Sequence, residues 1–160
     1  MNLKTFLPIL SLLLLGTAAF ARVHVYWPYD RLTQEADLIV IAAPVSVHDT
    51  TEKTVFPGVA EHGPKDGPSG SHLIPAIGVE TTFAVSSVLK GDTNTTTFVF
   101  HHLREAESKL GYGSLGIVAF DPKEKKQFLL FLKRESDGRY AALTGQTDPD
   151  DSVKDLGTTP

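Results

Sequence analysis

The stretch VETTFAVS at residues 79–86 decides the class of fold, because its side chains alternate between two kinds. Val79, Phe83 and Val85 fall on one side of an extended chain, and the residues between them are mostly polar or small. A period of two predicts a β-strand with one buried face. A turn rich in Gly, Asp and Asn follows at 90–94 and ends the strand.

Further segments on both sides have the length and composition of strands. They are residues 38–43, 95–103, 117–120, 127–134 and 139–144. The run QFLLFLKR at 127–134 indicates the most deeply buried strand, and the Asp137-Gly138 pair after it predicts a hairpin turn. Pro44 follows the apolar run LIVIAA and has no N–H for a ladder, so we expect it at a bulge or on a free edge.

The remaining segments predict loops and short helices. Asp30 is placed to cap a short helix over 31–36, and residues 104–110 could form two helical turns. Residues 48–78 contain nine glycines and prolines and show no periodicity, which predicts a loop that is either functional or disordered. From about residue 146 the chain is polar and acidic, which predicts a polar tail whose last few residues fray.

Six strands without a βαβ alternation indicate a mainly β protein. The spacing favours a small antiparallel OB-like β-barrel, closed or partly open, with one or two short helices. A β-sandwich is the alternative. A chain of 160 residues is enough for one such domain.

The first 21 residues have the features of a secretory signal peptide. Lys4 precedes an apolar run at 6–15, and Ala19-Phe20-Ala21 is a small-x-small cleavage sequence. The run is about ten residues long, and a membrane span needs roughly twenty. We therefore expect cleavage after Ala21, a single domain over 22–160, a secreted or periplasmic location and no integral membrane segment.

Composition excludes several classes of function. The formal net charge is −4, whereas a nucleic-acid binder needs a basic surface. The chain has no cysteine, which rules out disulfides, thiolate metal sites and a cysteine nucleophile. No cofactor motif with the required structural context is present, so none is expected.

The order of the segments resembles the netrin and tissue-inhibitor-of-metalloproteinase type of OB-fold domain, as found in small exported bacterial proteins. The resemblance is carried by ADLIVI at 36–41, TFAVSSVLKGD at 82–92 and QFLLFLK at 127–133. It implies a barrel over roughly 36–145. In the animal inhibitors an N-terminal cysteine clamps the catalytic zinc of the target, and this chain has no cysteine. The resemblance therefore implies a shape without that inhibitory chemistry.

Three aromatic residues near the start of the expected domain are candidates for binding. Tyr26, Trp27 and Tyr29 surround Pro28. They could cover one end of a barrel, or they could form a contact surface, since aromatic side chains dominate binding hot spots.

Histidines supply the other candidates. His62 and His72 lie in the expected loop with Glu61 nearby, and imidazole with carboxylate suits divalent metals. His24 would be third in the chain after cleavage at Ala21, an arrangement that can wrap Cu(II) or Ni(II).

The neighbouring pair His101 and His102 is expected on opposite faces of one strand, with one histidine packed inward and the other in solvent. Such a pair cannot share one metal ion without distorting the strand, which favours structural roles for both.

These observations favour a secreted or periplasmic, non-catalytic binding module whose partner is another protein or a component of the cell envelope. A metal-assisted extracellular hydrolase using His62 or His72 is one alternative, and a structural envelope protein is another.

Overall fold

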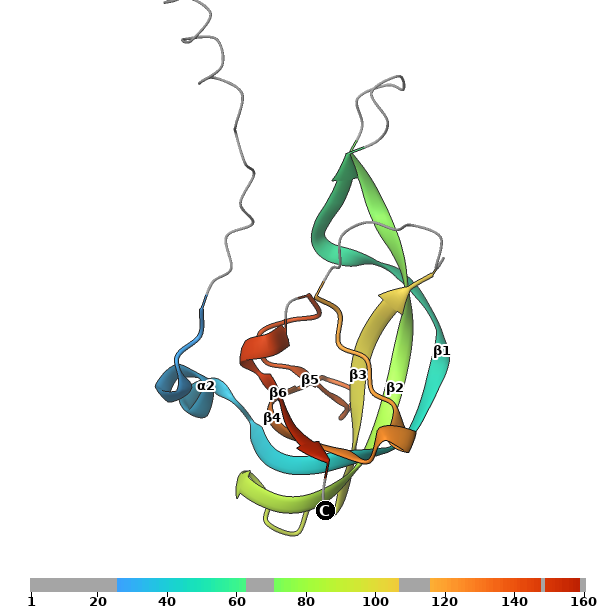
Figure 1. The fold of residues 1–160 in the computed structure, drawn as a ribbon. Helices are drawn as coiled ribbons and strands as arrows, with labels where there is room; N and C mark the ends of the chain where they lie inside the picture. Colours follow the sequence, from blue (N-terminus) through green and yellow to red (C-terminus); the bar gives the residue numbers. More distant parts are fainter. Residues whose placement is uncertain (1–25, 63–70, 107–115, 148, 159–160) are drawn as a thin grey trace, which may run out of the picture.

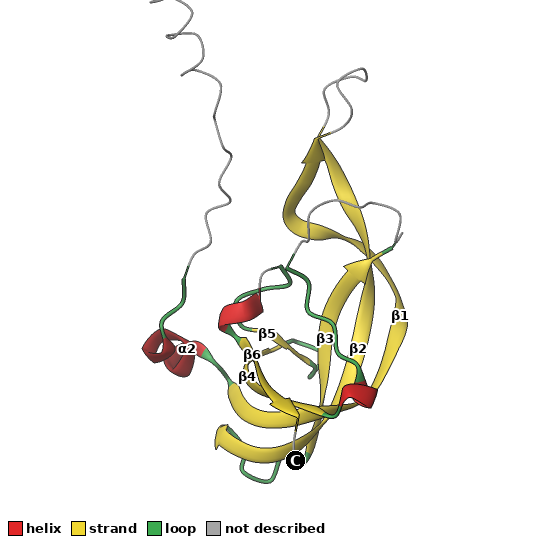
Figure 2. Cartoon of the chain, viewed as in Figure 1, coloured by secondary structure: helices red, strands yellow, loops and turns green. Residues whose placement is uncertain are grey.

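The computed structural model describes residues 26–62, 71–106, 116–147 and 149–158, without the side chains of 58–62 and 71–73. These residues form a mainly β structure with one α-helix and two short 3₁₀ turns in the described part (Figures 1 and 2). The elements are α2 (Tyr29–Glu35), β1 (Leu38–His62), β2 (Ser71–Lys90), β3 (Thr97–Glu105), η2 (Pro122–Glu124), β4 (Lys126–Arg134), β5 (Tyr140–Ala142), η3 (Pro149–Asp151) and β6 (Val153–Thr158).

The six strands form one mixed sheet whose hydrogen bonds make a ring. Strand β1 pairs with β2, β2 with β3, and β4 with β5, all antiparallel. The ring is closed by β1 against β4 and by one parallel rung between Phe100 of β3 and Tyr140 of β5. The predicted mainly β class is confirmed, and the parallel rung makes the sheet mixed rather than wholly antiparallel.

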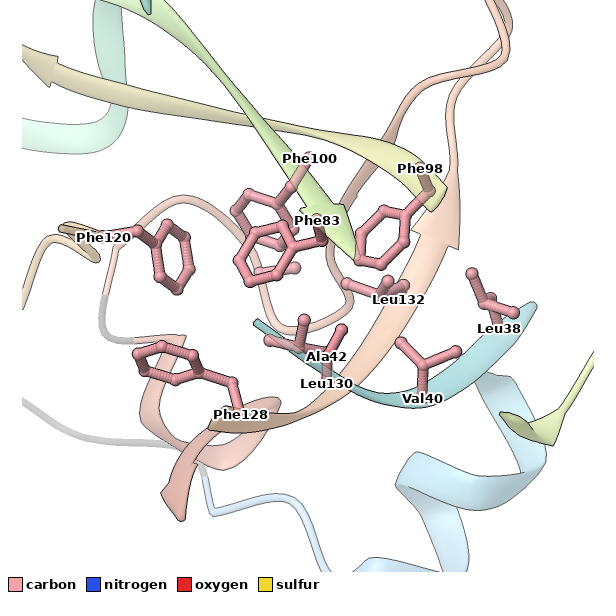
Figure 3. Close-up of a cluster of buried hydrophobic side chains, with 11 residues drawn as sticks. Leu38, Val40, Ala42, Phe83, Phe98, Phe100, Phe120, Phe128, Leu130 and Leu132 are labelled. Carbon is pink, nitrogen blue, oxygen red and sulfur yellow. The ribbon is translucent and has the colours of Figure 1, made fainter. Parts of the chain in front are cut away.

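Phenylalanines fill the interior of the ring. Phe83 lies at the centre, stacked on Phe98 at 5.2 Å and edge-on to Phe120 at 4.9 Å between ring centroids (Figure 3). Stacked and edge-to-face pairs add to the free energy gained from burying the rings. The buried interior cluster comprises Leu38, Val40, Ala42, Phe83, Phe98, Phe100, Phe120, Phe128, Leu130, Leu132 and Ala142.

Helix α2 packs on the outer side of the same strands. Leu32 of the helix and Ala36 at its C-cap bury Ile39 of β1 and Phe131 of β4, which alternate with the residues that face the interior. The helix begins at Tyr29, after Pro28, rather than after the predicted cap Asp30. Pro28 suits the start of a helix because its lack of an N–H leaves no donor unsatisfied.

The prediction of a loop over residues 48–78 is wrong at both ends. Residues 48–62 continue β1 and residues 71–78 begin β2, so only 63–70 fall outside the described part. Register shifts absorb the irregular residues, at Pro44/Ser46, Asp49/Lys53 and Val55/Ala60. A bulge admits one extra residue and turns the strand, which lets proline remain in the ladder.

The polar tail expected from about residue 146 contains regular structure. Residues 149–151 form η3 and residues 153–158 form β6, which pairs with β4 from Lys126 to Leu130. Backbone pairing with a buried strand holds this segment in spite of its acidic composition. Residues 117–120 are not a strand but an extended connection, coloured as loop in Figure 2, whose Phe120 enters the interior. Within the described residues, no helix has the length and apolar character needed to cross a bilayer.

Candidate functional site

The outer face of β2 and β3 carries a network of charged side chains. Two projections border this face: the distal half of the β1–β2 hairpin, and the turn between β4 and β5. We call residues 53–62 and 71–77 the arm, which extends beyond the ring in Figure 1. Phe56 is fully buried against Ala76 and Leu103 and so fixes the base of the arm to β3.

Gly78 allows β1 to come close to β2 at the base of the arm. A Cβ atom at this position would lie 2.6 Å from Thr50 Oγ1 and 2.9 Å from Glu52 Cβ, closer than real Cβ contacts. The Thr50 hydroxyl donates to the Gly78 carbonyl at 3.1 Å and accepts the backbone N–H of Glu52. The bulge between Asp49 and Lys53 is thereby held in place, and Glu52 reaches over β3.

His101 of β3 lies between two carboxylates. Its Nδ1 is 3.1 and 3.0 Å from the two oxygens of Glu135, in the turn after β4. Its Nε2 lies 3.1 Å from Glu52 Oε2, which is within ion-pair distance. This contact does not have the geometry of a hydrogen bond. The residue is only 7% exposed. The prediction of opposite faces for His101 and His102 is correct, but neither side chain is in solvent, because Glu52 and Glu135 cover His101.

Arg139 connects the carboxylates that surround His101. Its guanidinium contacts Glu80 at 3.0 Å and Asp137 at 2.8 Å, and it lies 3.6 Å from Glu135 and 4.0 Å from Glu52. The backbone N–H of Arg139 lowers the pKa of Asp137, burial opposes this shift, and the charge of Arg139 adds to it. We call the following seven residues the charged network: His48, Glu52, Glu80, His101, Glu135, Asp137 and Arg139.

The arrangement is suited to electrostatic recognition. Four carboxylates face one arginine and two histidines, so the network has excess negative charge unless both histidines are protonated and a further cation is present. Each imidazole is already in contact with carboxylate, as His48 Nε2 lies 3.2 Å from Glu80. Among the residues that the structure describes, no group of three His, Asp or Glu side chains has the geometry to hold a metal ion.

The predicted aromatic residues lie elsewhere, beside α2. Trp27 is half-buried, with the Arg31 guanidinium 3.5 Å above its ring, and its backbone N–H donates to Asp151 Oδ2 at 2.9 Å. Tyr29 contacts Phe131, with ring centroids 5.9 Å apart, yet remains 56% exposed. Tyr26 is 66% exposed. Trp27 and Tyr29 therefore pack on the outer helix cluster.

The predicted histidine candidates are described only in part. The backbone register at the far end of the arm places His62 opposite Ser71 and His72 opposite Glu61. Their side chains are outside the description, and His24 lies outside the described residues altogether. Figure 1 shows the arm and α2 at separate parts of the molecule.

Sequence reasoning did not find the charged network. Glu52 was inside the expected loop and Glu135 inside a turn, and neither position has a periodicity that could assign it to a face. The available signal was the alternation of 79–86, which places Glu80 on the polar side of its strand.

Comparison with known proteins gives no relative on which to draw: no family model, no curated protein and no solved structure matches the chain.

Proposed function

We propose that the chain is an exported, non-catalytic binding module of OB-like form whose binding surface is the outer face of β2 and β3. The observation that carries the proposal is the convergence of two projections on that face. Glu52 at the base of the arm and Glu135 in the β4–β5 turn both contact His101 of β3.

The strand order supports the OB-like part of the proposal. The ring runs β1-β2-β3-β5-β4 and returns to β1, with the parallel rung between β3 and β5. In OB folds, the face of the second and third strands binds ligands, and the connections after the first and fourth strands flank it. The arm and the 135–139 turn occupy those two connections.

The charge of the network favours a partner that offers cationic groups. The net negative charge would repel a phosphate backbone, whereas an exposed lysine or arginine of another protein, or an amine of an envelope component, would be attracted. Export rests on the signal-like residues 1–21, which makes an extracytoplasmic partner the natural one.

Crosslinking in the native cell envelope, followed by identification of the captured partner, tests this proposal. A Glu80→Gln and Asp137→Asn double variant removes two charges from the network at nearly constant side-chain size. A control that changes Glu35→Gln and Glu124→Gln removes two charges from exposed positions elsewhere.

We expect the network variant to lose most of the specific crosslinked partner and the control to keep it. Shortening the arm by replacing residues 57–73 with a Gly/Asn turn, which retains Phe56 and Ile74, should also reduce capture. Full capture by both the network variant and the shortened chain would contradict the proposed surface. Loss only on changing Tyr26→Ser and Tyr29→Ser would assign binding to the aromatic region instead.

A further inference from the structure

His101 connects three segments that are far apart in the sequence. Glu52 belongs to β1 at the base of the arm, His101 to β3, and Glu135 to the turn after β4. The side chain of His101 is 9% exposed, whereas those of Glu52 and Glu135 are 38% and 30% exposed. The imidazole is therefore the covered centre of a contact whose two outer partners are accessible to water.

The two sides of the ring impose a requirement on its protonation. A neutral imidazole has one N–H and one nitrogen lone pair, while the imidazolium has two N–H groups. In this structure each ring nitrogen lies 3.0–3.1 Å from a carboxylate oxygen. Loss of either proton would place a lone pair against a negatively charged oxygen. Only the imidazolium places an N–H on both carboxylate sides.

We propose that His101 is a pH-dependent clasp, which holds the base of the arm on the outer face of the ring when the imidazole is protonated and releases it when the proton is lost. The proton comes from and returns to solvent through the exposed carboxylates, and no covalent step is involved. Imidazole is the side chain whose charge changes across the pH range of natural compartments. The inference does not depend on the proposed binding function.

The other charged groups around His101 bear on the same equilibrium. Carboxylates outnumber the fixed cations, and Arg139 compensates only part of their charge. The neighbouring His102 is buried on the other face of the strand and is neutral at ordinary pH, so it does not compete for this proton. The groups around His101 are Glu52 from β1 and Glu135, Asp137 and Arg139 from the turn before β5. Glu80 from β2 joins them through Arg139, and His48 from β1 joins them through Glu80.

Two residues isolate the clasp from the rest of the arm. Gly78 and Phe56 hold the same region by close packing and burial, which do not change with pH. Release of the clasp should therefore loosen residues 50–56 locally without unfolding the ring.

Hydrogen exchange of the backbone amides of residues 50–56 in the whole chain tests the clasp. After correction for the intrinsic rate of exchange, we expect these amides to exchange roughly fivefold faster near pH 8 than near pH 5.5. This is the size of effect expected from a partly exposed ion pair. His101→Gln should remove this difference. His48→Gln, a histidine of the same network with a 60% exposed side chain, should keep it.

Two measurements keep the test decisive if His101→Gln folds poorly. Glu52→Gln retains the size of the side chain and should remove the pH dependence of the arm base on its own. Nitrogen NMR of the imidazole should show two N–H groups on His101 near pH 5.5. The clasp would be overturned if residues 50–56 of the wild-type chain opened equally at the two pH values. It would also be overturned if one ring nitrogen of His101 carried no proton near pH 5.5.

Discussion

His102 shows how strongly position within a strand controls the chemistry of one side chain. It is 4% exposed, lies edge-on to Phe120 and shares a 2.9 Å hydrogen bond with Thr81 Oγ1. Burial lowers its pKa to about 4, the adjacent His101 adds to the shift, and the nearby Val118 backbone opposes it. The sequence predicted alternation correctly, but it could not show that the outward residue, His101, would also be covered.

The lowered pKa of His102 predicts a loss of stability in acid. Between pH 6.5 and about 4, the unfolded chain binds a proton that the folded chain excludes, so the free energy of unfolding falls as pH falls. From neutral pH to about pH 5 the expected loss from this group is about 2 kcal/mol. Urea unfolding at the two pH values measures it.

Two variants separate His102 from the other titrating groups. His102→Gln cannot take up the proton and retains an amide that can bond Thr81, so its loss of stability on acidification should be smaller than that of the wild type. His48→Gln should lose as much stability on acidification as the wild type does. An unchanged difference in His102→Gln would show that another group is responsible.

No pattern in the amino-acid sequence singles out Gln146, which nevertheless supports β3 in the structure. Its Oε1 accepts the Leu103 N–H at 3.0 Å and its Nε2 donates to the His101 carbonyl at 3.2 Å. The side chain thus replaces a neighbouring strand beyond the single rung between β3 and β5.

We predict that Gln146→Met, which keeps the length of the side chain but removes both bonds, lowers the free energy of unfolding by about 1–2 kcal/mol. The amide of Leu103 should exchange with solvent much faster, while amides in β4 should not. Gln127→Met, a change of the same kind in a strand that keeps its backbone partners, is the control. Equal protection of Leu103 in both variants would contradict this role.

At the scale of elements, the hairpin of β1 and β2 is where sequence reasoning failed most. Glycine and proline suggested a loop, although Val47, Thr50 and Thr54 are β-branched residues that favour strands. Bulges resolve the conflict, because they place the awkward residues where the ladder is interrupted. The part of β2 at 79–86 and the strand at 127–134 were predictable, since their alternation or apolar run was uninterrupted.

The close approach of β1 to β2 at Gly78 predicts how a larger side chain there would affect the hairpin. Gly78→Ala forces the bulge of Thr50 and Glu52 away from β2, since the new Cβ would be 2.6–2.9 Å from their atoms. We expect a loss of about 1–3 kcal/mol in the free energy of unfolding, as for other overpacked sites. Hydrogen exchange of residues 50–56 should increase along with it.

Gly145→Ala is the matched control, because a Cβ there meets no atom within 4 Å, although the backbone has φ +104°. It should lower global stability through backbone strain alone and leave exchange in the arm base unchanged. The same exchange pattern in both variants would contradict the packing role of Gly78.

At the scale of the molecule, ring closure brings segments together that no local pattern could pair. The mainly β class followed from alternation, but β6 had to be missed, since an acidic and polar segment becomes a strand here only because β4 offers it a partner. The charged network has the same origin: its residues come from β1, β2, β3 and the 135–139 turn, and only the closed ring places them together.

The junction between the two ends of the described chain gives the last prediction. The buried carboxylate of Asp151 in η3 accepts the backbone N–H of Trp27 at 2.9 Å and thus fixes the segment before α2 to the segment before β6. Asp151→Ala leaves that N–H without its charged acceptor and should lower the free energy of unfolding by about 1–3 kcal/mol. Asp151→Asn retains one acceptor oxygen and should lose less.

Because Trp27 is the one tryptophan of the chain, its fluorescence reports this junction directly. We expect Asp151→Ala to shift the Trp27 emission toward that of exposed tryptophan at denaturant concentrations where circular dichroism still shows an intact sheet. Simultaneous loss of both signals, at the wild-type midpoint, would show that Asp151 does not hold the junction.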